Sequence, residues 1–213
     1  MPAKPKPSPE DDLAFMRSIL ERGGPPPMTL AICYLAGGLL YGLQCLFHVG
    51  QVAGLIQWPD LANLAFVVGI SVSFLSVLTW AILRDRRTGG GRRGPMATRT
   101  LSAAFSATGM ANCAVIIVFA VGAARDQDFA IWLYYAAIVF ALQSAAWFMA
   151  WTLRRKGWML ATALGGWVAA VTLGVLVREP FWYLGVCTLA CFLLFALPGW
   201  VMFRDARAAT VEP

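Results

Sequence analysis

The chain has 213 residues, of which 59% are hydrophobic and only 13% are charged. A soluble domain averages about 45–50% apolar and about 25% charged residues, so this composition argues against a soluble protein and indicates a membrane protein. The formal net charge is +6. Because the basic residues fall beside predicted membrane spans, the charge indicates topology and contact with anionic lipid headgroups, and we expect no nucleic-acid partner.

The first 27 residues are predicted to form a cytoplasmic N-terminal segment. Residues 1–9 are rich in Pro and Lys and should be extended and disordered. An amphipathic helix is expected over Ser8–Arg22, with Ser8 as its cap and an apolar face at helical spacing. That face consists of Leu13, Met16, Ile19 and Leu20. We expect this helix to lie along the membrane surface; the alternative is a docking segment, residues 8–24, for a membrane or cytosolic protein partner.

The fold class is predicted to be all-α, with six transmembrane helices in three hairpins. Each predicted span has about the 20 apolar residues that cross a bilayer. The six spans are Met28–Val49, Asp60–Leu83, Leu101–Ala123, Phe129–Leu153, Gly157–Val177 and Phe181–Phe203. They make up a transmembrane domain at 28–203, and residues 204–213 follow as a cytoplasmic tail.

Basic residues decide the predicted orientation. The loop Arg84–Thr100 reads RDRRTGGGRRGPMATRT and joins the second and third spans. With both termini on the same side as this loop, fifteen of the 17 Lys and Arg residues lie there, and only Arg125 and Arg178 lie on the other side. The positive-inside rule then predicts a multi-pass protein of the cell (inner or plasma) membrane with both termini in the cytoplasm. The residues expected to contact anionic lipid are Arg84, Arg86, Arg87, Arg92, Arg93, Arg154, Arg155 and Lys156.

Tryptophans support the same spans, because they gather at the predicted ends of helices, where aromatic rings favour the membrane interface. Trp58, Trp132 and Trp182 fall at outer ends, and Trp80, Trp151, Trp158 and Trp200 fall at inner ends. Trp147 and Trp167 lie deeper and should pack between helices. The second helix of each predicted hairpin ends with a Trp and, three or four residues later, an Arg. This pattern indicates either three hairpin repeats or the preference of Trp and Arg for the membrane interface acting three times.

Small residues indicate where helices approach closely. Gly38 and Gly42 have the GxxxG spacing, and Gly166, Ala170 and Gly174 repeat every fourth position in the fifth span. The spacing does not say whether the partner helix belongs to the same chain or to a second copy, so a homo-oligomer stays open. Pro198 and Gly199 predict a kink in the last span.

Polar residues within the spans form one predicted stripe. Tyr41, Gln44, His48 and Gln51 are spaced three, four and three residues apart, which places them on one helix face. Asn112 and Gln143 could face that stripe from the third and fourth spans. These six residues are a candidate polar path for a small solute; the alternative is hydrogen bonding between helices. Asp, Glu, Lys and Arg are missing from the centres of the spans, which argues against a proton-coupled carrier.

Five cysteines, Cys33, Cys45, Cys113, Cys187 and Cys191, lie in apolar segments without a CxxC pair, which argues against a disulfide framework. Cys187 and Cys191 share a helix face and could bind a soft metal such as Cu(I), but we expect ordinary packing. His48 is the single histidine, so a haem with two histidine ligands is excluded within one chain, and a Cys45–His48 catalytic pair would lack an orienting acid. No cofactor, metal or catalytic residue is predicted.

Three candidate functions are compatible with this sequence. The sequence favours a non-enzymatic membrane scaffold, regulator or accessory protein, because it combines a basic inner surface with few catalytic groups. The second candidate is a channel or facilitator for a small uncharged solute, along the polar stripe. The third is an enzyme acting on lipid, which would need the few charges predicted on the outer side; we interpret these as surface ion pairs. Those charges are Arg125, Asp126, Asp128, Arg178 and Glu179.

Overall fold

The computed structural model describes residues 26–88 and 96–211. The predicted amphipathic helix at 8–22, its docking alternative at 8–24, and Arg92 and Arg93 lie outside the described residues. The described residues are helical apart from short connections and contain no strand, so the all-α prediction is confirmed. Its elements are α2 (Met28–Val52), α3 (Asp60–Thr88), α5 (Met96–Asp126), α6 (Phe129–Arg154), α7 (Gly157–Val175), the 3₁₀ turn η1 (Leu176–Arg178), α8 (Pro180–Ala190), the π-helical segment η2 (Cys191–Ala196) and α9 (Leu197–Val211).

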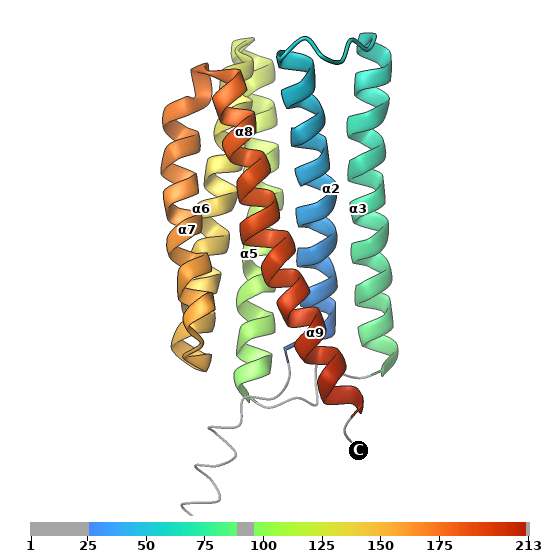
Figure 1. The fold of residues 1–213 in the computed structure, drawn as a ribbon, viewed down its shortest axis with the longest axis vertical. Helices are drawn as coiled ribbons and strands as arrows, with labels where there is room; N and C mark the ends of the chain where they lie inside the picture. The colour runs from blue at the N-terminus through green and yellow to red at the C-terminus, as the bar shows by residue number, and fades with distance from the viewer. Residues whose placement is uncertain (1–25, 89–95, 212–213) are drawn as a thin grey trace, which may run out of the picture.

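Six helical stretches are long and apolar enough to cross a membrane, and α8, η2 and α9 together make the sixth. The chain is therefore a multi-pass membrane protein built from three hairpins. We call the end that holds Met28 and the C-terminus of α9 the basic end, and the end that holds the turns after α2, α5 and α7 the distal end (Figure 1).

Three helices extend beyond the predicted limits of their apolar spans at the basic end. The α3 helix runs on to Thr88 and α5 begins at Met96, so the predicted loop Arg84–Thr100 is shorter than expected. The predicted tail 204–213 is helical as far as Val211. Hydropathy marks where a span leaves the apolar layer, whereas Arg and Ala are good helix formers that continue the helix into water.

The helices form two packed groups that share the sixth span. The α6 helix lies between α5 and α7, while α2 lies between α3 and the α8–η2–α9 span. In Figure 1 this last span crosses the front of the bundle, from the side of α7 at the distal end to the front of α2 at the basic end. Among the described helices, the extensive contacts of α3 are with α2 and those of α5 are with α6.

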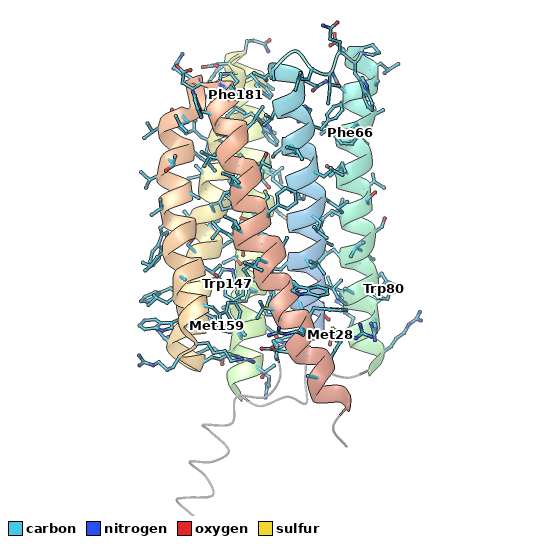
Figure 2. The ribbon with its side chains drawn as sticks, in the orientation of Figure 1. Met28, Phe66, Trp80, Trp147, Met159 and Phe181 are labelled. Atoms are coloured by element: carbon cyan, nitrogen blue, oxygen red, sulfur yellow. The ribbon has the colours of Figure 1, made fainter. Side chains whose placement is uncertain are left out.

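Apolar side chains fill the bundle from end to end. Near the basic end, Trp147 and Met159 are 2% and 1% exposed, and both lie in a cluster with residues of α2, α5 and α9 (Figure 2). Toward the distal end, Leu173 is fully buried in a second cluster that draws on α6, α7, α8 and η2. The prediction that Trp147 packs between helices is confirmed. Trp167 is partly buried and contacts Phe148, with 5.6 Å between ring centroids.

The GxxxG glycines of α2 pack against the sixth span of the same chain. A Cβ added to Gly38 would lie 2.2 Å from the backbone nitrogen of Ala196, and one added to Gly42 would lie 3.0 Å from the Phe192 ring. Gly199 approaches the backbone nitrogen of Leu35 in the same way, at 2.4 Å for its added Cβ. Going along α2, the partners step backward along the sixth span, as two antiparallel helices require. The helix partner that the sequence left open is therefore intramolecular.

A second close approach joins α6 and α7. A Cβ added to Gly166 would lie 2.1 Å from the Ser144 hydroxyl oxygen, which itself donates a hydrogen bond to the carbonyl of Phe140 (2.6 Å). Gly174, the other glycine of the predicted repeat, has open space where a Cβ would be. Only part of the small-residue repeat in α7 is therefore a packing surface within this chain.

The π-helical segment η2 ends two residues before Pro198, where the sequence predicts a kink. Proline has no backbone N–H, and its ring clashes with the carbonyl four residues earlier. A π turn is one of the ways a helix absorbs such a disruption. The wide turn at Cys191–Ala196 is the form that the predicted irregularity takes.

Candidate functional site

The predicted polar stripe is resolved into separate groups. Tyr34 donates its hydroxyl hydrogen to Gln143 Oε1 (2.5 Å), which links α2 to α6 in the buried interior. The structure thus brings Gln143 to α2, but to Tyr34 rather than to Tyr41. Tyr34 was not in the predicted set, although it precedes Tyr41 by seven residues, or two helical turns. Extending the stripe toward the N-terminus would have found it.

At the distal end, the stripe links α2 to α3. Gln51 Nε2 donates to Asn63 Oδ1 (2.6 Å), which leaves Gln51 Oε1 as the acceptor for His48 Nδ1 (2.7 Å). Because an amide oxygen can only accept, Nδ1 of His48 carries a hydrogen and donates this bond. His48 and Gln51 are thereby engaged in holding two helices together, which is the alternative that the sequence offered for the stripe.

Gln44 and Asn112 are the exceptions in the predicted set. Gln44 Oε1 and Asn112 Oδ1 are buried and have no hydrogen-bond partner among the described residues. Unpaired amide oxygens in an apolar interior are costly, so each could accept a hydrogen bond from water or a polar solute. The two described surface grooves lie elsewhere: one follows α5 from Ile117 to Asp126 and the other lies on α3 between Val72 and Leu83.

The basic end contains the described part of the predicted lipid-contact set. Arg84 lies over the Trp80 ring and Arg155 over the Trp151 ring, with guanidinium carbons 5.5 and 5.3 Å from the ring centroids. These stacked pairs place cations beside interfacial aromatic rings.

Other members of the set are used within the protein. Arg154 is partly buried and donates from Nη2 to Thr98 on α5 (3.4 Å), whereas Lys156 pairs with Asp205 on α9 (3.2 Å). Arg86 and Arg87 are exposed. The described cations therefore divide between internal contacts and a surface available to lipid headgroups.

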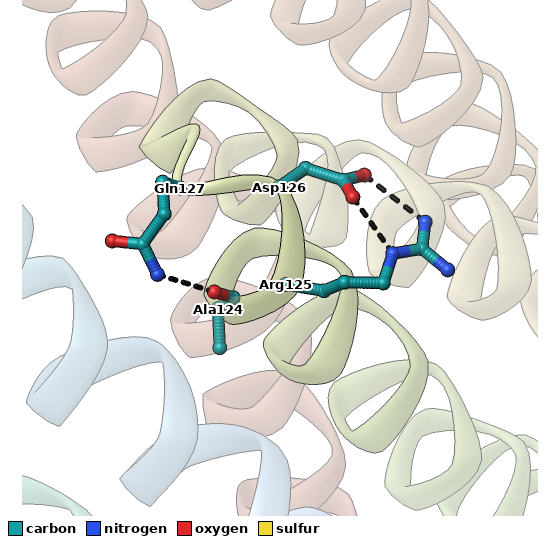
Figure 3. Close-up of polar contacts among 4 residues, drawn as sticks. All are labelled: Ala124, Arg125, Asp126 and Gln127. Atoms are coloured by element: carbon teal, nitrogen blue, oxygen red, sulfur yellow. Dashed lines mark hydrogen bonds and ion pairs between the residues drawn. The ribbon is translucent and has the colours of Figure 1, made fainter.

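At the distal end, the turn between α5 and α6 is closed by local polar contacts (Figure 3). Arg125 pairs with Asp126 through two hydrogen bonds of 2.7 and 3.1 Å, and Gln127 donates from its amide to the carbonyl of Ala124 (2.5 Å). Asp128 caps α6 by accepting from the backbone N–H of Ala130 (2.9 Å). These contacts are those of an exposed turn and a helix cap, as the sequence predicted for Arg125 and Asp126.

A cluster of three thiols lies in the distal half of the bundle. Cys45 of α2, Cys187 of α8 and Cys191 of η2 have sulfur atoms that all lie within 4.8 Å of one another. The Sγ atoms of Cys45 and Cys187 are 3.6 Å apart. We call these three residues the thiol cluster.

The sequence paired Cys187 with Cys191 but left Cys45 out of that pair. The spacing that would have included Cys45 is that of the GxxxG glycines. Gly38, Gly42 and Cys45 are four and three residues apart, so they share one side of α2. Once the two glycines are packed on the sixth span, the next residue on that face reaches Cys187 and Cys191.

Comparison of the chain with models of known protein families, with curated proteins and with solved structures gives no match.

Proposed function

We propose that this chain is a non-enzymatic scaffold, regulatory or accessory protein of the plasma or inner membrane. The observation that carries the proposal is the filled bundle centre, where Trp147, Met159 and Leu173 are between 0% and 2% exposed. A channel needs a continuous polar path, but apolar side chains occupy this interior at both ends of the bundle. The polar pairs Tyr34–Gln143 and Gln51–Asn63 support the same proposal because they join helices.

The proposed orientation places both termini in the cytoplasm. Its support is the excess of Arg and Lys at the basic end, together with Trp80 and Trp200, each 54% exposed near that end, and Trp182, 64% exposed near the other. Arg86 and Arg87 are free to contact anionic lipid in this orientation, alongside the stacked Arg84 and Arg155. Contact with a protein partner would use residues 8–24 or the apolar outer faces of α3 and α5, which a second copy of the chain could also cover.

One observation favours a second candidate, a facilitator for a small uncharged solute. Gln44 Oε1 and Asn112 Oδ1 are buried and unpartnered among the described residues, so they would accept hydrogen bonds from such a solute. This candidate requires the packed interior to open around the two amides.

A paired experiment separates the two functions. Purified protein in liposomes would be assayed for flux of water, glycerol, urea and ammonia, beside a Gln44→Leu variant and empty liposomes. In parallel, crosslinking in native membranes followed by quantitative purification would compare the full chain with a variant lacking residues 8–24. The scaffold proposal expects flux equal to that of empty liposomes, and a protein recovered at fixed stoichiometry with the full chain.

Loss of that protein on deletion of 8–24 would assign the contact to the N-terminal segment, and its retention would assign it to the outer helix faces. Flux above background that Gln44→Leu removes would overturn the scaffold proposal in favour of the facilitator. Recovery of the chain without any partner at fixed stoichiometry would also count against a scaffold.

A further inference from the structure

Among the described residues, the thiol cluster is the one group of three metal-ligating side chains whose donor atoms converge. Cys45 comes from α2 and the other two members from successive turns of the sixth span, where Cys187 and Cys191 are only 7% and 8% exposed. The surrounding second core cluster is apolar, with Tyr183 one turn before Cys187 using its hydroxyl on the carbonyl of Leu133 (2.6 Å). Three soft donors are thus gathered in a place with few competing ligands.

We propose that Cys45, Cys187 and Cys191 bind one soft monovalent metal ion, Cu(I), through their three sulfur atoms. This site goes beyond the proposed scaffold function and does not depend on it. A metal held at about 2.3 Å from each of three sulfurs requires sulfur–sulfur separations of about 4 Å. The 3.6 Å between Cys45 and Cys187, and the 4.8 Å limit over all three, bracket that value.

The donor set selects among metals. Thiolate sulfur favours Cu(I) and Zn²⁺, whereas carboxylate and carbonyl oxygen favour Mg²⁺ and Ca²⁺. Structural Zn²⁺ is almost always bound by four protein ligands, and this group supplies three sulfurs and no histidine or carboxylate. His48 lies one turn beyond Cys45, but neither of its ring nitrogens belongs to the group of donor atoms that converge here. Three sulfurs without a fourth ligand suit the low coordination number of Cu(I).

The charge balance sets the expected chemistry. A thiol that binds as thiolate releases its proton. Cu⁺ bound by two thiolates and one neutral thiol leaves a single negative charge and releases two protons, while three thiolates would leave two negative charges. One thiolate would leave the site neutral but with a single strong donor, because the thiolate is the form that binds metal. Each further thiolate adds a charge that is costly in an apolar interior. We expect the balance at two thiolates, with two protons released per ion. The copper stays Cu(I) throughout, so no electron donor or acceptor is needed.

The packing of α2 explains how the site is preorganised. Gly38 and Gly42 bring the α2 backbone against Ala196 and Phe192, and Cys45 follows on the same helix face. The ion would therefore join α2 to the sixth span at the point where η2 begins. Bound metal should raise the unfolding temperature, because it binds the folded arrangement and not the separated helices.

The test uses the full chain, purified under reducing conditions in detergent micelles. Cu(I) would be titrated in competition with a chromophoric chelator, and Ag(I) would serve as a probe that has no redox chemistry here. We expect one ion per chain, an ultraviolet sulfur-to-metal charge-transfer band, a shell of three sulfurs by X-ray absorption, and binding at least tenfold tighter than that of Zn²⁺.

Single variants Cys45→Ser, Cys187→Ser and Cys191→Ser should each weaken Cu(I) binding at least tenfold. Cys33→Ser and Cys113→Ser are matched controls, since these cysteines lie outside the cluster, and they should bind as the parent does. The metal-free unfolding temperature of each variant, with Cys→Ala as a second substitution, separates loss of a ligand from loss of the fold.

Retained binding in a folded Cys187→Ala variant, or loss of binding in the Cys33 and Cys113 controls, would overturn the proposal. So would preferential binding of Zn²⁺. A Cys45–Cys187 disulfide in place of any metal binding would identify the cluster as a redox pair instead.

Discussion

Gly38 of α2 faces the backbone of Ala196, with only 2.2 Å between the nitrogen of Ala196 and the place where a Cβ would be. Backbone atoms cannot move aside as the end of a flexible side chain can. This contact therefore sets how closely α2 approaches the sixth span, and with it the positions of the residues that follow on the same face of α2.

Replacing this glycine tests the approach directly. Gly38→Ala should lower the free energy of unfolding by about 3 kcal/mol, because the added methyl group forces the two helices apart. Gly69→Ala is the matched control, since Gly69 has open space around its missing Cβ; the helix preference for Ala over Gly should leave its stability unchanged or raise it by up to about 1 kcal/mol. Unfolding in mixed detergent micelles, followed by tryptophan fluorescence, gives both values. Equal stability of the two variants would contradict the packing described here.

The α6–α7 contact predicts a rescue. Gly166→Ala should be destabilising because its Cβ would lie 2.1 Å from the Ser144 hydroxyl, whereas Ser144→Ala removes that oxygen and leaves the serine Cβ 3.3 Å away. The double variant should therefore be more stable than Gly166→Ala alone, with a coupling of about 1–3 kcal/mol. Gly174→Ala, where nothing lies within 4 Å, should be close to neutral. The parent, Gly166→Ala, Ser144→Ala and the double variant would be compared in one double-mutant cycle. Strict additivity of the two single effects would argue against the contact.

Loss of the hydrogen bond from Tyr34 to Gln143 should lower the free energy of unfolding modestly. Tyr34→Phe keeps the edge contacts with Phe105 and Trp147 but loses the hydroxyl that satisfies the buried amide. The expected loss of unfolding free energy is about 1 kcal/mol. Tyr134→Phe is the control, because the Tyr134 side chain is exposed. The double variant Tyr34→Phe, Gln143→Leu should lose less unfolding free energy than the sum of the two single variants. A loss in Tyr34→Phe equal to that in Tyr134→Phe would show that this hydrogen bond does not stabilise the fold.

Gln51 predicts a local effect. It joins His48 on its own helix to Asn63 on α3, and the extensive contacts of α3 among the described helices are with α2. Gln51→Leu should speed amide hydrogen exchange at the start of α3 while leaving α6 and α7 unchanged, because local opening needs less free energy than global unfolding. Gln57→Leu, at an exposed position in the same connection, is the control. Faster exchange across the whole bundle would show that α3 is not separable in this way.

Orientation is tested by chemical labelling. Adding a cysteine at Gln57 should raise the labelling of intact cells by a membrane-impermeant maleimide, because the α2–α3 connection is proposed to face outward. Thr88→Cys, at the end of α3, should become labelled only after the membrane is permeabilised. The parent chain with its native cysteines supplies the background. The reverse pattern would invert the proposed topology.

Composition and charge were enough to predict the six helices, since twenty-residue apolar stretches bounded by charge leave few other structures in a bilayer. The ends of α3 and α9 were not predictable from hydropathy, because the helix continues where the lipid ends. The thiol cluster was not predictable from the sequence pattern either. Its members are separated by 142 residues between Cys45 and Cys187, and only the antiparallel pairing of α2 with the sixth span brings them together.

The wide turn η2 has a consequence for how this span tolerates change. A π turn holds about one more residue than an α turn. Removing one residue from the turn would let the helix close into regular geometry, at little local cost. Because the shortened turn would still complete about 360°, the residues beyond it would keep their facing, and Gly199 would stay on the side that meets Leu35. A single-residue deletion in this turn should therefore be tolerated better than one in a regular α-helical part of the same span, where it would rotate the following residues by about 100°.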